Sequence, residues 1–294
     1  MPVTRIGIHG KDLQSKSSRF MEKLLDHLKD FNAEIWVSAK FLKQFKSSRI
    51  EEYKLKSFDD GDNLRLLDFF FSIGGDGTLL ESVTYIGRAE VPIIGINTGR
   101  LGFLATNSRD DMEESIDALF KGDYSINSRS IIKLISTPKL FGNLNFALND
   151  FTIMKKDTSS MITVHVHVDG ELLNSYWSDG IIVSTPTGST GYSLSCGGPL
   201  VHPKSESFVI TAVSPHNLGT RPIVLADNSE ITFHIEGRSK KYLVSLDSRF
   251  ETVDESVKLK IKKEKFRVKL IQLEGQSYFN TLRQKLNWGL DIRN

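Results

Sequence analysis

The sequence predicts two domains: an α/β domain with a parallel sheet over residues 1–122, and a β-rich, sandwich-like domain over residues 123–273. Up to residue 122, short apolar runs alternate with helical patterns, which is typical of a parallel sheet covered by helices. From Tyr124, strand-length segments follow one another with turn residues between them, which favours a sandwich or layered sheet. Residues 274–294 contain a helical pattern, Tyr278–Leu286, that we expect to pack back on the first domain.

Composition indicates an ordinary globular protein. Hydrophobic residues make up 39% and charged residues 25% of the 294 positions. Lys plus Arg (38) nearly balance Asp plus Glu (36), so no net charge favours nucleic acid or a membrane surface as partner. Cys196 is the single cysteine, and the N-terminus lacks the apolar core of a signal peptide. No apolar span of 18 residues occurs, and we therefore expect a cytoplasmic protein.

The elements of the first domain follow from local periodicity. A strand over 5–10 leads to a helix with Phe20, Leu24, Leu25 and Leu28 on one face. The polar segment 46–62 has no clear period and is expected to be a loop. Further strands are expected over 33–37, 66–73 and 92–96, and further helices over 78–85 and 110–120.

The second domain is expected to consist of strands joined by turns. The segments with strand character are 131–136, 146–154, 161–168, 181–185, 208–213, 230–235, 241–246 and 257–273.

The first candidate site is the turn after the apolar run 66–73. Gly74, Gly75 and Gly77 permit close approach of a ligand's phosphates to the backbone, and a helix starting near Thr78 would present its N–H groups to them. Asp76 does not suit a plain phosphate cradle, but a carboxylate there could accept a proton from a hydroxyl or hold a metal ion. The alternative is an ordinary strand–turn–helix in which Asp76 is only a turn residue.

A second glycine-containing loop, 97–102, follows the strand predicted over 92–96. Both loops would lie at carboxyl ends of parallel strands, where ligands of α/β sheets bind. The first strand lacks G-x-G-x-x-G, so the usual dinucleotide fingerprint is absent.

The densest signal in the second half is the run 178–199, rich in Gly, Ser and Thr with a single Tyr. Hydroxyls and open backbone N–H groups suit a ligand with ribose and amide groups. A plain flexible loop is the alternative, but loops of this length in compact domains are usually functional. Cys196, within this run, has no basic activator nearby and is given no nucleophilic role.

Two further features of the second half carry polar groups in apolar surroundings. Asn149 and Asp150 interrupt an apolar strand, and either a bound ligand or a bulge would satisfy them. His165 and His167 share one strand face and could bind metal, but no third ligand lies nearby, so a solvated face is favoured and no metal site is predicted.

Together these motifs resemble the NAD kinase family, whose members phosphorylate the 2′-hydroxyl of the adenosine ribose of NAD to give NADP. The resemblance covers most of the chain, and its most specific part is the run TPTGSTGYSLSCGGP. The matching pieces, in family order, are GGDGTLL (74–80), NTGRLGF (97–103), LND (148–150), SDGIIVSTPTGSTGYSLSCGGP (178–199) and SPHNLGTRPIV (214–224).

The resemblance implies a role for each matching residue. Asp76 resembles the catalytic base, and the turn around it (Gly74, Gly75, Gly77 and Thr78) the phosphate loop. The residues that resemble NAD contacts are Gly77, Phe103, Asn149, Asp150, Asp179, Thr190, Tyr192 and Ser195. Asp179 would reach the nicotinamide half of NAD bound by a neighbouring subunit.

The resemblance also implies substrates, cofactor and assembly. NAD and ATP would be the substrates, Mg²⁺ would accompany ATP, and the protein would be a homo-oligomer, either a dimer or the homotetramer usual in the family. Because no Walker-type lysine loop occurs, Mg²⁺ and the glycine-loop amides are expected to carry most of the charge neutralisation.

Two departures from the family pattern stand out. Gly191 replaces a common alanine, and Leu246-Asp247-Ser248-Arg249 replaces a common Asp-Gly, which puts a ligand role for Asp247 in doubt.

Two other functions are compatible with parts of the pattern. A diacylglycerol-type lipid kinase or sugar kinase shares the Gly-Gly-Asp-Gly turn, but the long hydroxyl-rich run gives it no support. A non-catalytic NAD sensor would have no need of a carboxylate base at position 76. The donor range (ATP or polyphosphate) and the use of NADH are left open by the residues.

Overall fold

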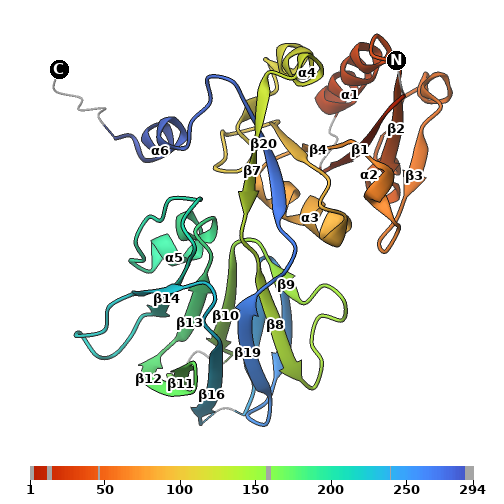
Figure 1. Ribbon diagram of the computed structural model, residues 1–294. Helices are drawn as coiled ribbons and strands as arrows, with labels where there is room; N and C mark the ends of the chain where they lie inside the picture. The colour runs from red at the N-terminus through yellow and green to blue at the C-terminus, as the bar shows by residue number, and fades with distance from the viewer. Residues whose placement is uncertain (1–2, 12–14, 46, 157–159, 239, 289–294) are drawn as a thin grey trace. The chain divides into compact units, whose positions relative to one another are not determined.

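The computed structural model describes residues 3–11, 15–45, 47–156, 160–238 and 240–288 (Figure 1). The chain forms two compact units: unit 1 comprises residues 1–128 and 268–294, and unit 2 comprises residues 129–267. The expected boundaries lay at 122 and 273. Two strands expected in the β-rich domain, β7 (Tyr124–Arg129) and β20 (Val268–Leu273), belong to the sheet of unit 1 instead.

Unit 1 is built on one largely parallel sheet, which confirms the predicted α/β class. β1 pairs in parallel with β2 and with β4, and β5 pairs in parallel with β4 and β20. β1 thus separates β2 and β3 from β4 and β5. The strand order is β3 (Lys56–Phe58), β2 (Ala33–Ser38), β1 (Thr4–Gly10), β4 (Phe69–Ile73), β5 (Ile93–Asn97), β20 and β7, and β6 (Asn107–Ser108) pairs with β5.

Helices cover this sheet. α1 (Ser15–Lys29) and α4 (Met112–Lys121) share one apolar cluster with the sheet, to which α1 contributes Leu24 and α4 contributes Ile116. α3 (Asp76–Ile86) packs near Gly95, where a Cβ atom would come within 3.0 Å of Leu79 Cδ1. The short helices are α2 (Ala39–Leu42), η1 (Ile50–Tyr53), η2 (Leu64–Leu66) and η3 (Gly87–Ala89).

The prediction of a loop over 46–62 was wrong, since this segment contains η1 and β3. β3 has only three residues, which is too short for a period to show in the sequence. It is held by parallel pairing with β2 and by Phe58, whose ring makes edge contacts with Phe70 and Tyr85. These partners are distant in the sequence, so local pattern could not reveal the strand.

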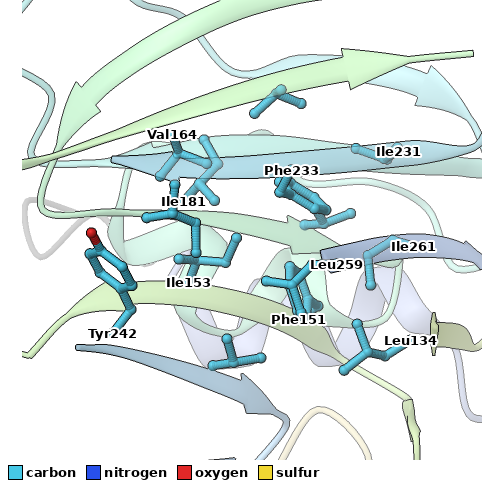
Figure 2. Close-up of a cluster of buried hydrophobic side chains, with 14 of the residues drawn as sticks. Leu134, Phe151, Ile153, Val164, Ile181, Ile231, Phe233, Tyr242, Leu259 and Ile261 are labelled. Carbon is cyan, nitrogen blue, oxygen red and sulfur yellow. The ribbon is translucent and has the colours of Figure 1, made fainter. Parts of the chain in front are cut away.

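Unit 2 is a sandwich of two antiparallel sheets, as predicted. Their inner faces share one core, and Figure 2 shows Val164 and Phe233 of one sheet beside Phe151 and Ile181 of the other. One sheet has the order β15 (Ile223–Ala226), β14 (Ser207–Val213), β13 (Gly180–Ser184), β10 (Asp150–Lys155), β17 (Tyr242–Leu246), β18 (Arg249–Val253). The other has the order β12 (Glu171–Ser178), β11 (Ile162–Val168), β16 (Ile231–Gly237), β19 (Lys258–Lys263), β8 (Ile132–Thr137), β9 (Phe146–Ala147).

The strand expected over 146–154 is split. β9 ends at Ala147 and β10 begins at Asp150, so Leu148 and Asn149 join strands of different sheets. An apolar run does not reveal a change of sheet, because both strands bury their side chains in the same core. This crossing places Asn149 at the end of the sandwich.

The C-terminal helix α6 (Tyr278–Leu286) has the predicted bounds and lies in unit 1. Ser277 caps it by accepting a hydrogen bond from Asn280 N at 3.1 Å. The helix buries Leu282, and Lys285 Nζ donates to the carbonyl of Leu101 at 2.6 Å. In the described part of the chain, no helix combines the length and apolar character needed to cross a membrane.

Candidate active site

The glycine turn connects β4 to α3 in unit 1. Gly74 has φ +148°, and a Cβ atom there would lie 2.3 Å from Thr78 Oγ1, so a side chain is excluded. Gly75 and Gly77 are exposed, and a Cβ atom at either would meet nothing within 4 Å. Thr78 is buried and its N–H already donates to Gly75 O at 3.0 Å. The open backbone of the turn is therefore at Gly75 and Gly77 rather than at Thr78.

Asp76 is the first residue of α3 and is half-buried. Its Oδ2 accepts a hydrogen bond from Phe103 N at 2.8 Å, and its Oδ1 accepts from Leu104 N at 2.9 Å and Ala105 N at 3.0 Å. The N-terminus of α3 adds a favourable dipole for a carboxylate. Asp76 thus has two properties: its carboxylate is held in a fixed orientation beside an open glycine turn, and it anchors the loop that follows β5.

The loop after β5 is held from its own side by Asn97. Its Oδ1 accepts from Gly99 N at 2.6 Å, and its Nδ2 donates to the carbonyls of Arg100 and Ala105. At Gly102 a Cβ atom would lie 1.9 Å from Asp76 Oδ1, so only glycine fits there. Phe103 is half-buried, and Lys285 Nζ lies 5.6 Å from the centre of its ring. The structure therefore brings Phe103 and Asp76 together through the backbone of one loop.

In unit 2, the hydroxyl-rich run folds against Asn149. Thr185 N donates to Asn149 O at 2.9 Å, and Thr185 Oγ1 donates to Leu148 O at 2.6 Å. A Cβ atom at Gly188 would lie 2.0 Å from Asn149 O, so the glycine permits this contact. Asn149 Oδ1 is buried and has no hydrogen-bond partner among the described residues. A buried acceptor without a donor is the arrangement that a ligand hydroxyl or amide would complete.

Asp247 holds the segment 148–150 in place. Its Oδ2 accepts from Leu148 N at 3.0 Å, and its Oδ1 accepts from Asn149 N at 2.8 Å and Asp150 N at 3.2 Å. Burial raises the pKa of Asp247, and these backbone hydrogen bonds oppose the rise. Asp247 is therefore a positioning group for Asn149 and Asp150, a role that its distant place in the sequence did not reveal.

The remaining residues of the run sort into two groups. Ser189 and Ser193 are buried. Ser189 Oγ donates to Pro186 O at 2.7 Å, and Ser193 Oγ shares a hydrogen bond with Thr211 Oγ1 at 2.9 Å. Thr190 is half-buried and donates to Thr187 O at 3.2 Å, while Tyr192 and Ser195 are exposed. The elements here are η4 (Gly188–Thr190) and α5 (Tyr192–Ser195).

Gly191 lies beside the polar pair, since a Cβ atom there would come within 3.7 Å of Asp150 Oδ2 and 3.8 Å of Asn149 Nδ2. These are ordinary contact distances, so an alanine at this position would fit against the pair without displacing it. Burial raises the pKa of Cys196, which agrees with the absence of a nucleophilic role.

Asp179 stands apart from this group. It directly precedes β13, whereas Thr185 follows that strand, and its carboxylate pairs with Lys155 Nζ at 2.5 Å. Among the described residues, no hydrogen bond or ion pair joins Asp179 to Asn149 or Asp150. Among the described residues no three His, Cys, Asp or Glu side chains gather in a way that could hold a metal ion.

Asp150 gives the first testable prediction. Burial, with the nearby Asp247 charge, raises its pKa from 3.8 to about 7. The folded state therefore binds this proton more tightly than the unfolded state, so the stabilisation is complete below about pH 4 and is lost as pH rises through about 7. We expect Asp150→Asn to remove this loss, so that its melting temperature falls less between pH 5 and pH 8 than that of the parent. Thermal unfolding across this range checks it, and parallel curves for the two proteins would contradict it.

Known proteins resemble both units. The family model described as the ATP-NAD kinase N-terminal domain matches residues 6–124, and the ATP-NAD kinase C-terminal domain matches residues 148–273. The NAD kinase of Cytophaga hutchinsonii is 51% identical over 288 residues, covering 98% of this chain and 99% of that protein. The NAD kinase of Christiangramia forsetii is 43% identical, covering 99% of this chain and all of that protein.

Solved structures agree in fold. The yeast NADH kinase complexed with NADH has a TM-score of 0.86 at 22% identity, covering 100% of this chain and 90% of that one. An NAD kinase from Archaeoglobus fulgidus in complex with ATP has a TM-score of 0.71 at 25% identity, covering 97% of this chain and 99% of that one.

Proposed function

The chain belongs to the NAD kinase family, and we propose that it transfers the terminal phosphoryl group of ATP to the 2′-hydroxyl of the adenosine ribose of NAD, giving NADP. The observation that carries the proposal is the carboxylate of Asp76, fixed by three backbone N–H groups beside the open backbone of Gly75 and Gly77.

In this reaction Asp76 acts as the general base. It takes the proton of the ribose hydroxyl as the hydroxyl oxygen bonds to phosphorus, and ADP leaves with the electrons of the broken P–O bond. The three amide donors fix the orientation of the carboxylate, so no side-chain reorganisation is needed at the moment of transfer. The glycine turn allows the phosphates to approach the N-terminus of α3.

The acceptor would be held by the polar residues of unit 2. Asn149 Oδ1, buried and unpartnered among the described residues, is available to a ribose hydroxyl of NAD. Asp150 lies next to it, and Thr190, Tyr192 and Ser195 belong to the run that packs against Asn149. Phe103, whose N–H donates to Asp76, is the residue that the family resemblance assigns to adenine. We assign Asp179 to a neighbouring subunit's site, as the family resemblance implies.

Magnesium would enter as part of the substrate MgATP. A divalent cation on the phosphates neutralises the charge that builds up during transfer, and Mg²⁺ usually binds through phosphates and water rather than in an all-protein cage. The donor atoms fit this mode, because no three-ligand cluster of His, Cys, Asp or Glu is found in the described residues. A homo-oligomer, tetrameric in the family pattern, and a cytoplasmic location stay predictions.

The alternatives are less well supported. A lipid kinase with the same glycine turn would not require the Asn149–Asp150 pair or the run that packs on it. A non-catalytic NAD sensor would not require an oriented carboxylate at the phosphate turn. NADP formation from NAD and MgATP in a coupled assay distinguishes the three functions.

Variants of the acceptor site test the assignment further. Asn149→Ala and Tyr192→Ala are expected to raise the KM for NAD about tenfold or more and to leave the KM for ATP within twofold, because they contact only the acceptor. Asn145→Ala is the control, since Asn145 is also half-buried in unit 2 and its side chain donates to Leu134 O at 2.8 Å, away from the acceptor residues. Equal increases in both KM values would point to general unfolding and would contradict the assignment.

A further inference from the structure

A cluster of charged side chains lies at the carboxyl end of β1, outside the residues discussed so far. Glu81, on the second turn of α3, places Oε2 2.7 Å from Lys11 Nζ and Oε1 2.5 Å from Lys40 Nζ. His9 Nε2 lies 3.7 Å from Glu81 Oε2. Burial alone would raise the pKa of Glu81, but hydrogen bonds from Lys11 and Lys40 outweigh it and lower this pKa to about 2. The carboxylate is therefore ionised and shared by two ammonium groups.

The cluster has an excess of positive charge. His9 is fully buried and shares a hydrogen bond with Ser38 Oγ at 2.7 Å, and burial lowers its pKa to about 4, so it is neutral at physiological pH. Two lysines then face one carboxylate. The side chains of Lys11 and Lys40 are 52% and 55% exposed, so both ammonium groups are open to an anion from solvent.

The position of the cluster is the place where α/β sheets bind phosphates. In the order β3-β2-β1-β4-β5, β2 and β3 are added on one side of β1 and β4 and β5 on the other, so the strand order reverses between β1 and β4. Ligands bind at the carboxyl ends of the strands at such a switch point. Lys11 directly follows β1, and its N–H donates to Ile73 O at 3.3 Å. Ile73 ends β4 and precedes Gly74. Lys11 and the glycine turn therefore flank this point from its two sides.

The contacts around Gly10 keep the two strand ends close. A Cβ atom at Gly10 would lie 2.5 Å from the Phe41 ring and 3.0 Å from Ile73 O, so a larger residue would separate them. Phe41 belongs to α2, the helix that also carries Lys40. The packing that brings β1 to β4 thus also brings Lys40 to Glu81.

We propose that Lys11 and Lys40 bind the polyphosphate chain of the phosphoryl donor at the switch point, with Glu81 as the shared counter-ion of their ammonium groups. This rests on the proposed function and adds a donor subsite to it. Each ammonium group has three N–H donors, so it can keep its bond to Glu81 and also donate to a phosphate oxygen. These lysines supply the positive charge that a Walker-type loop supplies in other kinases.

The test compares single and double variants. Lys11→Ala and Lys40→Ala are each expected to raise the KM for ATP about tenfold, with the KM for NAD within twofold, because a charged hydrogen bond to phosphate is lost. Inorganic tripolyphosphate should inhibit the parent competitively against ATP, and the variants should weaken this inhibition by the same factor; adenosine should inhibit all of them equally. Lys56→Ala is the matched control, since Lys56 is 51% exposed and pairs with Glu34 at 2.8 Å, on the edge strand β3.

Glu81→Gln separates phosphate binding from a purely structural salt bridge. It breaks the same ion pairs but leaves both ammonium groups free, so the KM for ATP should stay unchanged or fall. An increase like that of Lys11→Ala would overturn the proposal, as would a rise in the KM for NAD with no change for ATP. If the parent forms no NADP from NAD and ATP, the proposed function fails. Calorimetric titration of ATP and of tripolyphosphate, without NAD, still decides whether the lysines bind phosphate.

Discussion

Asp76→Asn is expected to lower kcat by about two to four orders of magnitude, the usual contribution of a general base. Asparagine has nearly the same shape but cannot take the proton of the ribose hydroxyl. Its Oδ1 can still accept from Leu104 N and Ala105 N, whereas its NH₂ group cannot accept from Phe103 N. We therefore expect an additional loss of stability of about 1–3 kcal/mol. A coupled assay measures turnover, calorimetry measures NAD affinity, and thermal unfolding measures stability.

The control for Asp76 must loosen the same loop without touching the base. Asn97→Ala does this, because Asn97 holds residues 99–105 from the end of β5. If the carboxylate is the base, the kcat of Asp76→Asn should be at least tenfold lower than that of Asn97→Ala, although the two variants lose similar stability. Equal losses of kcat would show that Asp76 acts only by holding the loop, and turnover within a few-fold of the parent would remove it from catalysis.

Asp247→Ala is expected to have the largest effect on stability, about 3–5 kcal/mol, with a rise of tenfold or more in the KM for NAD. It leaves the N–H groups of Leu148, Asn149 and Asp150 without their acceptor in a buried place. Asp247→Asn keeps one acceptor oxygen and should cost about 1–2 kcal/mol. Because Asp247 raises the pKa of Asp150, both variants should also lower the pH at which Asp150 loses its proton. Denaturant unfolding and KM measurements across pH check these effects.

The matched control is Asp227→Asn. Asp227 is also a buried carboxylate of unit 2 and pairs with Lys263 Nζ at 2.7 Å. Among the described residues, no hydrogen bond or ion pair joins it to Asn149, Asp150 or Tyr192. It should lose stability to a similar degree as Asp247→Asn without changing the KM for NAD. If the KM for NAD rises equally in both, Asp247 acts only through general stability and not by positioning Asn149.

The residues proposed for the site have local signals in the sequence. Three such signals can each be read from a few consecutive residues: the glycines of the turn, the carboxylate between them, and the polar pair in an apolar strand. The same holds for most strands of unit 2 and for α6, whose periodicity covers whole elements. By contrast, β3 with three residues, and β12, β15 and β18 with their exposed positions, leave too weak a pattern.

The sequence by itself determined the fold class, most of the longer elements, the family and the strand–turn–helix at the glycine turn. Only the tertiary structure decided which distant groups meet: β20 with β5, Asp247 with Asn149 across 98 positions, and Lys11 with Glu81. The physical reason is that periodicity and turn chemistry act over a few residues. Strand pairing and the hydrogen bonds of buried carboxylates depend instead on how whole elements pack, and that packing is set by the shared cores of each unit.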